Sequence, residues 1–114
     1  ELVRGLLPAL ADAGNIYLSI DKDVFAEDMV KTNWDQGVFR LRHTEAVFAA
    51  CAGRVIGADV CGDVSDYEYA SPFKRFLSRL DGQEPCDPQA LRGWQEGQRA
   101  VNAALLESLG KVLR

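Results

Sequence analysis

The sequence has few of the residues that build zinc and redox sites. Its 114 residues include a single histidine, His43, and three widely spaced cysteines, Cys51, Cys61 and Cys86, with no Cys-x-x-Cys pair. A zinc site needs a set of such ligands at short, characteristic spacings. We therefore predict no zinc site, and we expect the cysteines to be reduced thiols of a cytoplasmic protein.

Long apolar runs and basic clusters are also missing. No apolar run approaches the roughly 20 residues of a membrane helix, and the first residues do not have the pattern of a signal peptide. The formal net charge is -4 and the basic residues are scattered, whereas nucleic acid binding needs them gathered on one surface. We expect neither a membrane nor a nucleic acid as a partner. Because the chain does not begin with methionine, we expect a fragment or a processed chain.

Short β-branched runs alternate with helical patterns, in a globular composition of 47% hydrophobic and 26% charged residues. Strands that alternate with helices predict parallel pairing through right-handed crossovers, and hence an α/β fold. Two strands are too few for an independent parallel sheet, so we expect the rest of the sheet upstream of Glu1. We predict helices over residues 2–13, 43–52, 72–80 and 88–113, strands over 15–20 and 54–61, and a loop over 26–37.

The predicted helices have start signals and apolar faces. Pro8 marks a start or a kink in the first helix, Pro72 is at the first position of the third, and Thr44 is the predicted N-cap of the second. The expected apolar faces are Leu2, Leu6, Leu7 and Leu10 in the first helix, Ala46, Val47, Ala50 and Cys51 in the second, and Leu91, Trp94, Ala100, Val101, Leu105 and Leu109 in the last.

Two carboxylates follow the first predicted strand, in the stretch SIDKD at 19–23. Because side chains alternate along a strand, Asp21 and Asp23 would point the same way and their carboxylates would converge. Ligands of open α/β sheets bind outside the carboxyl ends of the strands, and a divalent cation relieves the repulsion between two carboxylates. Carboxylate oxygens suit Mg²⁺ or Mn²⁺. The pair is therefore a candidate metal site, with a solvated strand end as the alternative.

The same stretch matches in full the Ser-x-Asp-x-Asp motif that ends a late strand in the ureohydrolase family of arginase, agmatinase and formiminoglutamase. Gly37, RHTEA at 42–46, VIGADV at 55–60 and the helix over 88–113 follow in the order of that family's corresponding segments. From Asn15 onward, the chain resembles this family.

The resemblance implies an arginase-like three-layer α/β/α fold with a parallel sheet, in which residues 1–114 are the C-terminal part of one domain. It implies that Asp21 and Asp23 are ligands of a binuclear Mn²⁺ site, whose activated water attacks the guanidinium carbon of an arginine-like or agmatine-like substrate and releases urea or a related amide. Ser19 would pack or form a hydrogen bond. The full-length enzyme is expected to be a cytoplasmic homo-oligomer.

The chain departs from the family pattern after each strand. VFAED at 24–28 lacks the family's usual Asp-Pro, and CGDVS at 61–65 replaces a Glu-Val-Asn-Pro stretch. Asp63 is then either a substrate-binding acid or a simple loop carboxylate. The family's other metal ligands come from Asp-x-His-x-Asp motifs, which this chain lacks, and His43 is expected to face solvent or cap its helix. We therefore expect this chain alone to be inactive.

Two other interpretations remain open. IYLSIDKDV at 16–24 also fits the first motif of haloacid-dehalogenase-like phosphatases, in which Asp21 would be the nucleophile and Asp23 the general acid, with Mg²⁺ bound. In the second, the chain is a non-catalytic structural or oligomerisation segment. Trp34 and Asp35 belong to the loop near the candidate site, where they would contact substrate or fold over their own domain.

Overall fold

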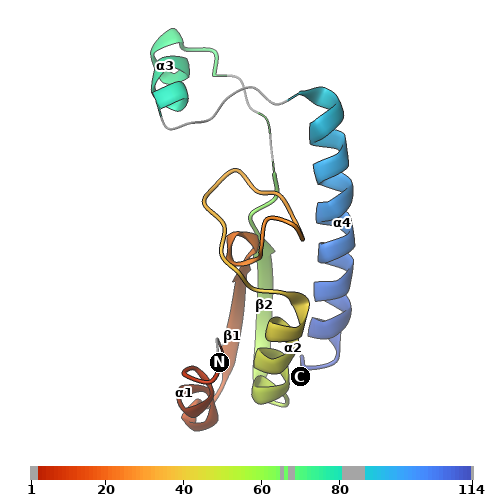
Figure 1. The fold of residues 1–114 in the computed structure, drawn as a ribbon. Helices are drawn as coiled ribbons and strands as arrows, with labels where there is room; N and C mark the ends of the chain where they lie inside the picture. The colour runs from red at the N-terminus through yellow and green to blue at the C-terminus, as the bar shows by residue number, and fades with distance from the viewer. Residues whose placement is uncertain (1–2, 65, 67–68, 81–86, 114) are drawn as a thin grey trace.

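In the described part of the chain, a short helix precedes a parallel βαβ unit and two further helices follow it (Figure 1). The computed structural model describes residues 3–64, 66, 69–80 and 87–113. Strands β1 (Ile16–Asp21) and β2 (Val55–Cys61) pair in parallel, and helix α2 (Leu41–Cys51) connects them. The predicted α/β class and both predicted strands are confirmed. Leu2 and Cys86, to which we assigned a helix face and a reduced thiol, lie outside the described residues.

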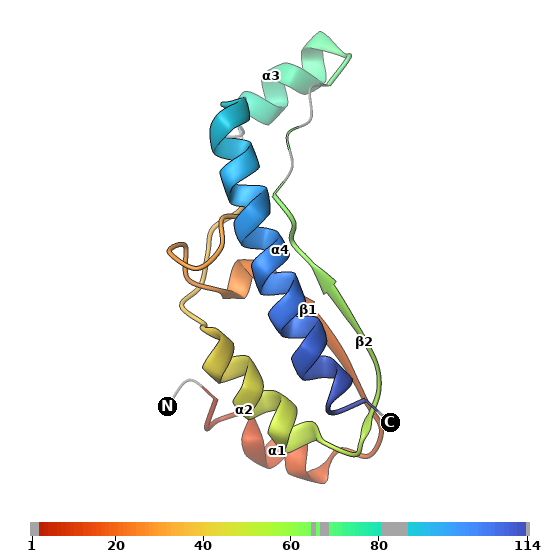
Figure 2. The same ribbon diagram turned by 90° about the vertical axis from the view of Figure 1, so that its right-hand side faces the viewer.

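One face of the sheet is covered by helices. Helix α4 (Pro88–Gly110) runs alongside the strands and packs with α2 on the same face (Figure 2). Strand alternation turns Ile16, Leu18 and Ile20 toward these helices, whereas Tyr17, Ser19 and Asp21 point the other way. The outward face carries large apolar side chains in contact with water, since Tyr17 is 61% exposed and Ile56 of β2 is 58% exposed.

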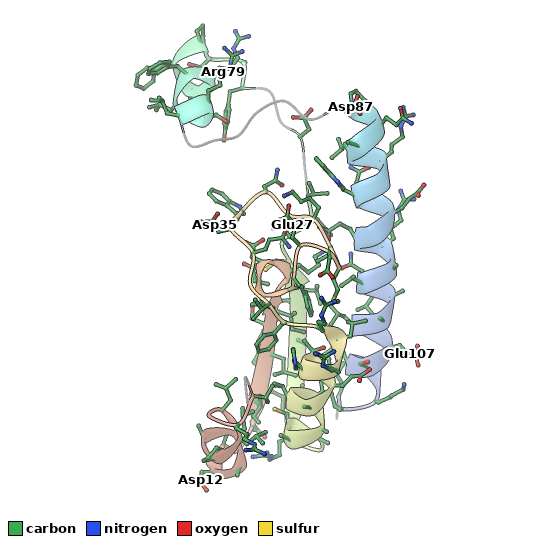
Figure 3. The ribbon with its side chains drawn as sticks, in the orientation of Figure 1. Asp12, Glu27, Asp35, Arg79, Asp87 and Glu107 are labelled. Carbon is green, nitrogen blue, oxygen red and sulfur yellow. The ribbon has the colours of Figure 1, made fainter. Side chains whose placement is uncertain are left out.

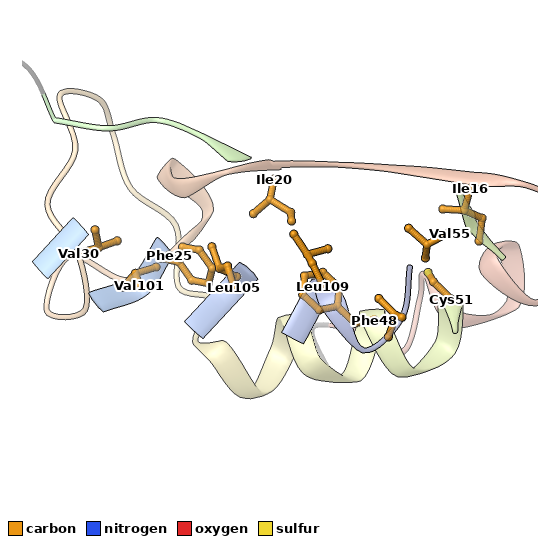
Figure 4. Packing of buried hydrophobic residues seen from close by; sticks show 11 residues of the cluster. Ile16, Ile20, Phe25, Val30, Phe48, Cys51, Val55, Val101, Leu105 and Leu109 are labelled. Atoms are coloured by element: carbon orange, nitrogen blue, oxygen red, sulfur yellow. The ribbon is translucent and has the colours of Figure 1, made fainter. Parts of the chain in front are cut away.

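The core forms between the inward face of the sheet and these two helices (Figure 4). Phe25 and Leu105 are fully buried in it, and full burial of such a side chain stabilises the fold by about 1.5–3 kcal/mol. The buried cluster comprises Ile16, Ile20, Phe25, Val30, Phe48, Cys51, Val55, Val101, Leu105, Leu109 and Val112.

Helix α4 begins and packs largely as its sequence predicts. Asp87 at the N-cap accepts a hydrogen bond from the Ala90 N–H at 2.9 Å, and a proline follows at the first helical position. Val101, Leu105 and Leu109 are buried at helical spacing, as expected. The helix ends at Gly110, before the predicted residue 113, because the chain after it turns back to pair with the start of β2.

Helix α2 corrects two predictions. It begins at Leu41, so Thr44 lies inside the helix and donates its hydroxyl to the Leu41 carbonyl at 2.7 Å instead of serving as the N-cap. The backbone N–H of Arg40, at the N-cap, is accepted by His43 Nδ1 at 3.0 Å, which confirms that His43 caps its helix. Ala46 is exposed, because the sheet selects the face that carries Thr44, Phe48 and Cys51.

The remaining helices lie at opposite ends of the chain's long axis (Figure 1). Helix α1 (Leu7–Asp12) begins near Pro8, and the Arg54 guanidinium donates to the Ala13 carbonyl just after it at 2.6 Å. Helix α3 (Pro72–Leu80) has the predicted bounds and no buried residue, since Phe73, Phe76, Leu77 and Leu80 are all exposed.

Within residues 3–64, 66, 69–80 and 87–113, no helix is long and apolar enough to cross a bilayer.

Candidate metal site at the carboxyl end of the sheet

Asp21 and Asp23 lie at the carboxyl end of β1, but they are not on the same strand. Asp21 is the last residue of β1, and Asp23 belongs to a 3-10 helix, η1 (Lys22–Val24). Strand alternation therefore does not align this pair, contrary to the prediction. Asp21 instead caps the 3-10 turn, because its Oδ1 accepts the backbone N–H of Asp23 at 3.2 Å. A capped turn, and not an extended strand, keeps the two residues together.

The two carboxylates have different surroundings. Asp21 is exposed, whereas Asp23 is half-buried, and its buried Oδ1 has no hydrogen-bond partner among the residues that the structure describes. A buried acceptor without a donor costs about 1–3 kcal/mol, and more if it is charged. Carboxylate oxygens of this kind are ligands that Mn²⁺ or Mg²⁺ accepts, so the donor set suits such a cation.

The two carboxylates supply only part of a coordination shell. Among the described residues, no group of three or more His, Cys, Asp or Glu side chains is placed to hold a metal ion. Divalent manganese and magnesium prefer six or so oxygen ligands. The pair therefore fits a metal centre that draws further ligands from elsewhere.

Two glycines lie against this turn. Gly62 has φ +81°, and a Cβ added there would lie 2.5 Å from Asp21 Oδ1 and 2.9 Å from the Lys22 backbone nitrogen. The Gly37 N–H donates to the Asp23 carbonyl at 2.6 Å, and a Cβ at Gly37 would lie 2.4 Å from the Val24 carbonyl oxygen. Only glycine permits this approach at either position. Sequence reasoning noted Gly37 but missed Gly62.

Lys22, between the two aspartates, is buried where Asp21 is exposed, and its role was not anticipated. Its side chain is fully buried, and its ammonium donates to Asn102 Oδ1 of α4 at 2.9 Å and pairs with the Asp63 carboxylate. This hydrogen bond from Lys22 lowers the pKa of Asp63 below its ordinary value. Asp63, the predicted substrate-binding acid, is thus engaged by Lys22, although its side chain remains 64% exposed. The one feature of the sequence that could have indicated this role is the position of Lys22 directly between the two candidate metal ligands.

The loop over 26–37 extends beyond the strand ends, where Glu27 and Asp35 are found (Figure 3). Inside the loop, the Gln36 side-chain amide donates to the Val30 carbonyl at 2.7 Å. On its outside, Arg40 Nη2 donates to both carboxylate oxygens of Asp28, at 2.7 and 3.0 Å. Trp34 is exposed in this loop. The loop lies near the site, as predicted, and its contact with substrate stays a prediction.

On the outward face of the sheet, Ser19 forms the kind of bond we expected. Its hydroxyl donates to Asp59 Oδ1 of β2 at 2.9 Å. A hydrogen bond to the same Asp59 carboxylate raises the pKa of the Tyr17 phenol. Cys51 and Cys61 are free thiols, as predicted. The outward face therefore carries an acidic, hydrogen-bonded strip that continues from Asp21.

Comparison of the chain with protein-family models, with curated proteins and with solved structures gives no match. The resemblance to the ureohydrolases therefore rests on SIDKD at 19–23 and on the order of the elements around it.

Proposed function

We propose that this chain supplies two metal ligands, Asp21 and Asp23, to a ureohydrolase-like enzyme that hydrolyses a C–N bond of a guanidino substrate. The observation that carries the proposal is the buried Asp23 Oδ1, which has no donor within the described part of the chain, two residues from the exposed carboxylate of Asp21. A cation held between them would supply the missing partner. The resemblance of SIDKD at 19–23 to the ureohydrolase motif supports manganese as that cation.

The residues of the turn and those packed around it have different roles in the proposed site. When bound, Mn²⁺ would supply an activated water and would stabilise negative charge on the reacting carbon's substituents. Asp21 and Asp23 would hold the metal. Gly62 leaves room for the Asp21 carboxylate, and Gly37 fixes the Asp23 backbone through its N–H. The loop over 26–37 stands over the same end of the sheet and would limit the access of water.

We further propose that residues 1–114 form the C-terminal part of a three-layer α/β/α domain in a cytoplasmic homo-oligomer. Parallel sheets are normally covered on both faces. Here the outward face exposes Tyr17 and Ile56 to water, which supports a further layer of helices over it. Additional strands and helices would also bring the metal ligands that the described residues do not provide.

The test is a titration of the chain with Mn²⁺, in which binding is measured as the loss of the free Mn²⁺ signal in electron paramagnetic resonance. We expect the chain to bind Mn²⁺ weakly, and Asp21→Asn or Asp23→Asn to abolish the binding. Asp12→Asn is the matched control, because Asp12 lies at the opposite end of the sheet (Figure 3). Absence of binding by the wild-type chain, or equal binding by Asp23→Asn, would refute the metal site.

A second measurement separates the hydrolase from the phosphatase. The chain alone is expected to release no urea from arginine or agmatine, because two carboxylates do not complete a binuclear site. Urea release by the isolated chain with Mn²⁺ would contradict the proposed division of ligands. Trapping of an acyl phosphate on Asp21 with a phosphomonoester would favour the phosphatase mechanism instead.

A further inference from the structure

Lys22 has an unusual place between the two proposed metal ligands. Its side chain is fully buried on the helix side of the sheet, whereas the neighbouring Asp21 is exposed. A buried ammonium is costly unless it is paired and hydrogen-bonded. A buried lysine at this position therefore requires partners that are fixed by the fold.

Those partners come from two other segments of the chain. The Lys22 ammonium donates to Asn102 Oδ1 at 2.9 Å and pairs with Asp63, and Asn102 Nδ2 donates to the same Asp63 Oδ1 at 3.3 Å. The three side chains form a closed set. It joins η1, the segment after β2 and the middle of α4.

The set also holds the segment that touches Asp21. Gly62, next to Asp63, lies directly against Asp21 Oδ1 and the Lys22 backbone nitrogen. Gln98, one turn before Asn102 on α4, is buried and donates to the carbonyls of Gly62, at 3.4 Å, and of Lys31 in the loop over 26–37. Helix α4 thereby fixes both segments that enclose the turn.

From these contacts we infer that Lys22 is a positioning residue for the metal site, with Asp63 as its counter-ion and not as a substrate-binding acid. The role of the turn in metal binding rests on the proposed function, whereas the contacts of Lys22 with Asp63 and Asn102 do not. Asp63 Oδ1 already accepts bonds from Lys22 and Asn102. Lys22 holds the Asp21–Asp23 turn from the helix side, so that both carboxylates keep their places before a cation binds.

The experiment compares Lys22→Met with Lys111→Met. Both remove an ammonium paired with a carboxylate, but Lys111 is exposed and lies at the far end of α4. We expect Lys22→Met to weaken Mn²⁺ binding about tenfold or more, as the loss of outer-shell partners of metal ligands does, while Lys111→Met leaves it unchanged.

Amide hydrogen exchange gives a readout that does not depend on metal. The Asp23 N–H donates to Asp21, and the Gly37 N–H donates to the Asp23 carbonyl. Lys22→Met should accelerate exchange at both amides about tenfold, while the Ile16 N–H, bonded to the Arg54 carbonyl at 2.8 Å, keeps its rate. If wild-type chain binds no Mn²⁺, the proposed function fails, but this exchange experiment still decides the role of Lys22.

Asp63→Asn removes the counter-ion of Lys22 but keeps a side-chain oxygen that can accept its hydrogen bond, and the 64% exposed position leaves room for the amide. We expect it to weaken Mn²⁺ binding less than Lys22→Met does, and the double variant to bind no more weakly than Lys22→Met, since the two residues act as one unit. Additive losses would overturn the inference. So would exchange rates at Asp23 that are the same in Lys22→Met and Lys111→Met.

Discussion

Gly62→Ala is the substitution that tests the geometry of the turn most directly. At φ +81° any L side chain pays about 1–2 kcal/mol for the left-handed backbone. The new Cβ would also lie 2.5 Å from Asp21 Oδ1 and 2.9 Å from the Lys22 backbone nitrogen, so the segments must separate. Forced overpacking costs a further 1–3 kcal/mol or so, which gives about 2–5 kcal/mol in all.

Gly53→Ala is the matched control, because it isolates the backbone cost. Gly53 has φ +75°, and a Cβ there meets no atom within 4 Å. We expect Gly53→Ala to lower the free energy of unfolding by about 1–2 kcal/mol only. Urea unfolding followed by circular dichroism measures both variants, with the midpoint and the slope m determined separately. If the two variants agree within about 0.5 kcal/mol at equal m, the close contact between Gly62 and Asp21 is not formed.

Three further predictions concern the core, pH and thiol reactivity. Leu105→Ala should destabilise the fold by about 2–5 kcal/mol because Leu105 is fully buried, whereas Leu106→Ala, one residue on and 63% exposed, should change the free energy of unfolding by less than about 0.5 kcal/mol; urea titration measures both. The hydrogen bond from Lys22 lowers the pKa of Asp63 in the folded chain. The stabilisation that the ionised Asp63 carboxylate provides is therefore complete above the ordinary aspartate pKa and is lost as the pH falls through the lowered pKa. Unfolding midpoints measured from neutral to acid pH should fall less steeply in Asp63→Asn than in the wild-type chain. Iodoacetamide should label the exposed Cys61 before Cys51, which is fully buried and should react only on unfolding. Partial desolvation also raises the pKa of the Cys61 thiol, so Cys61 should be labelled more slowly than a thiol in a small peptide. Mass spectrometry measures both labelling rates.

The regular elements could be predicted from local patterns. β-branched runs predicted β1 and β2 to within a residue, and the spacing of Val101, Leu105 and Leu109 predicted the buried face of α4. These predictions succeed because each depends on side chains within one element. The α2 prediction failed at Thr44 because the helix begins earlier, at Leu41. It failed at Ala46 because the sheet that packs on the helix determines which face is buried.

The candidate site shows the same division. The identity of Asp21 and Asp23 as a carboxylate pair at a strand end follows from the sequence alone, since strand length and charge are local properties. Their arrangement does not, because β1 ends at Asp21 and a 3-10 turn begins there.

By itself, the sequence determined that this chain is an α/β unit with two aspartates at the end of its first strand. Only the tertiary structure decided that Lys22 is buried and that Asp63 forms an ion pair with its ammonium. Residues 22, 63 and 102 are far apart in the chain, and no spacing rule relates them. They meet because β2 pairs beside β1 and α4 packs across both, so a contact over 80 positions depends on the whole fold.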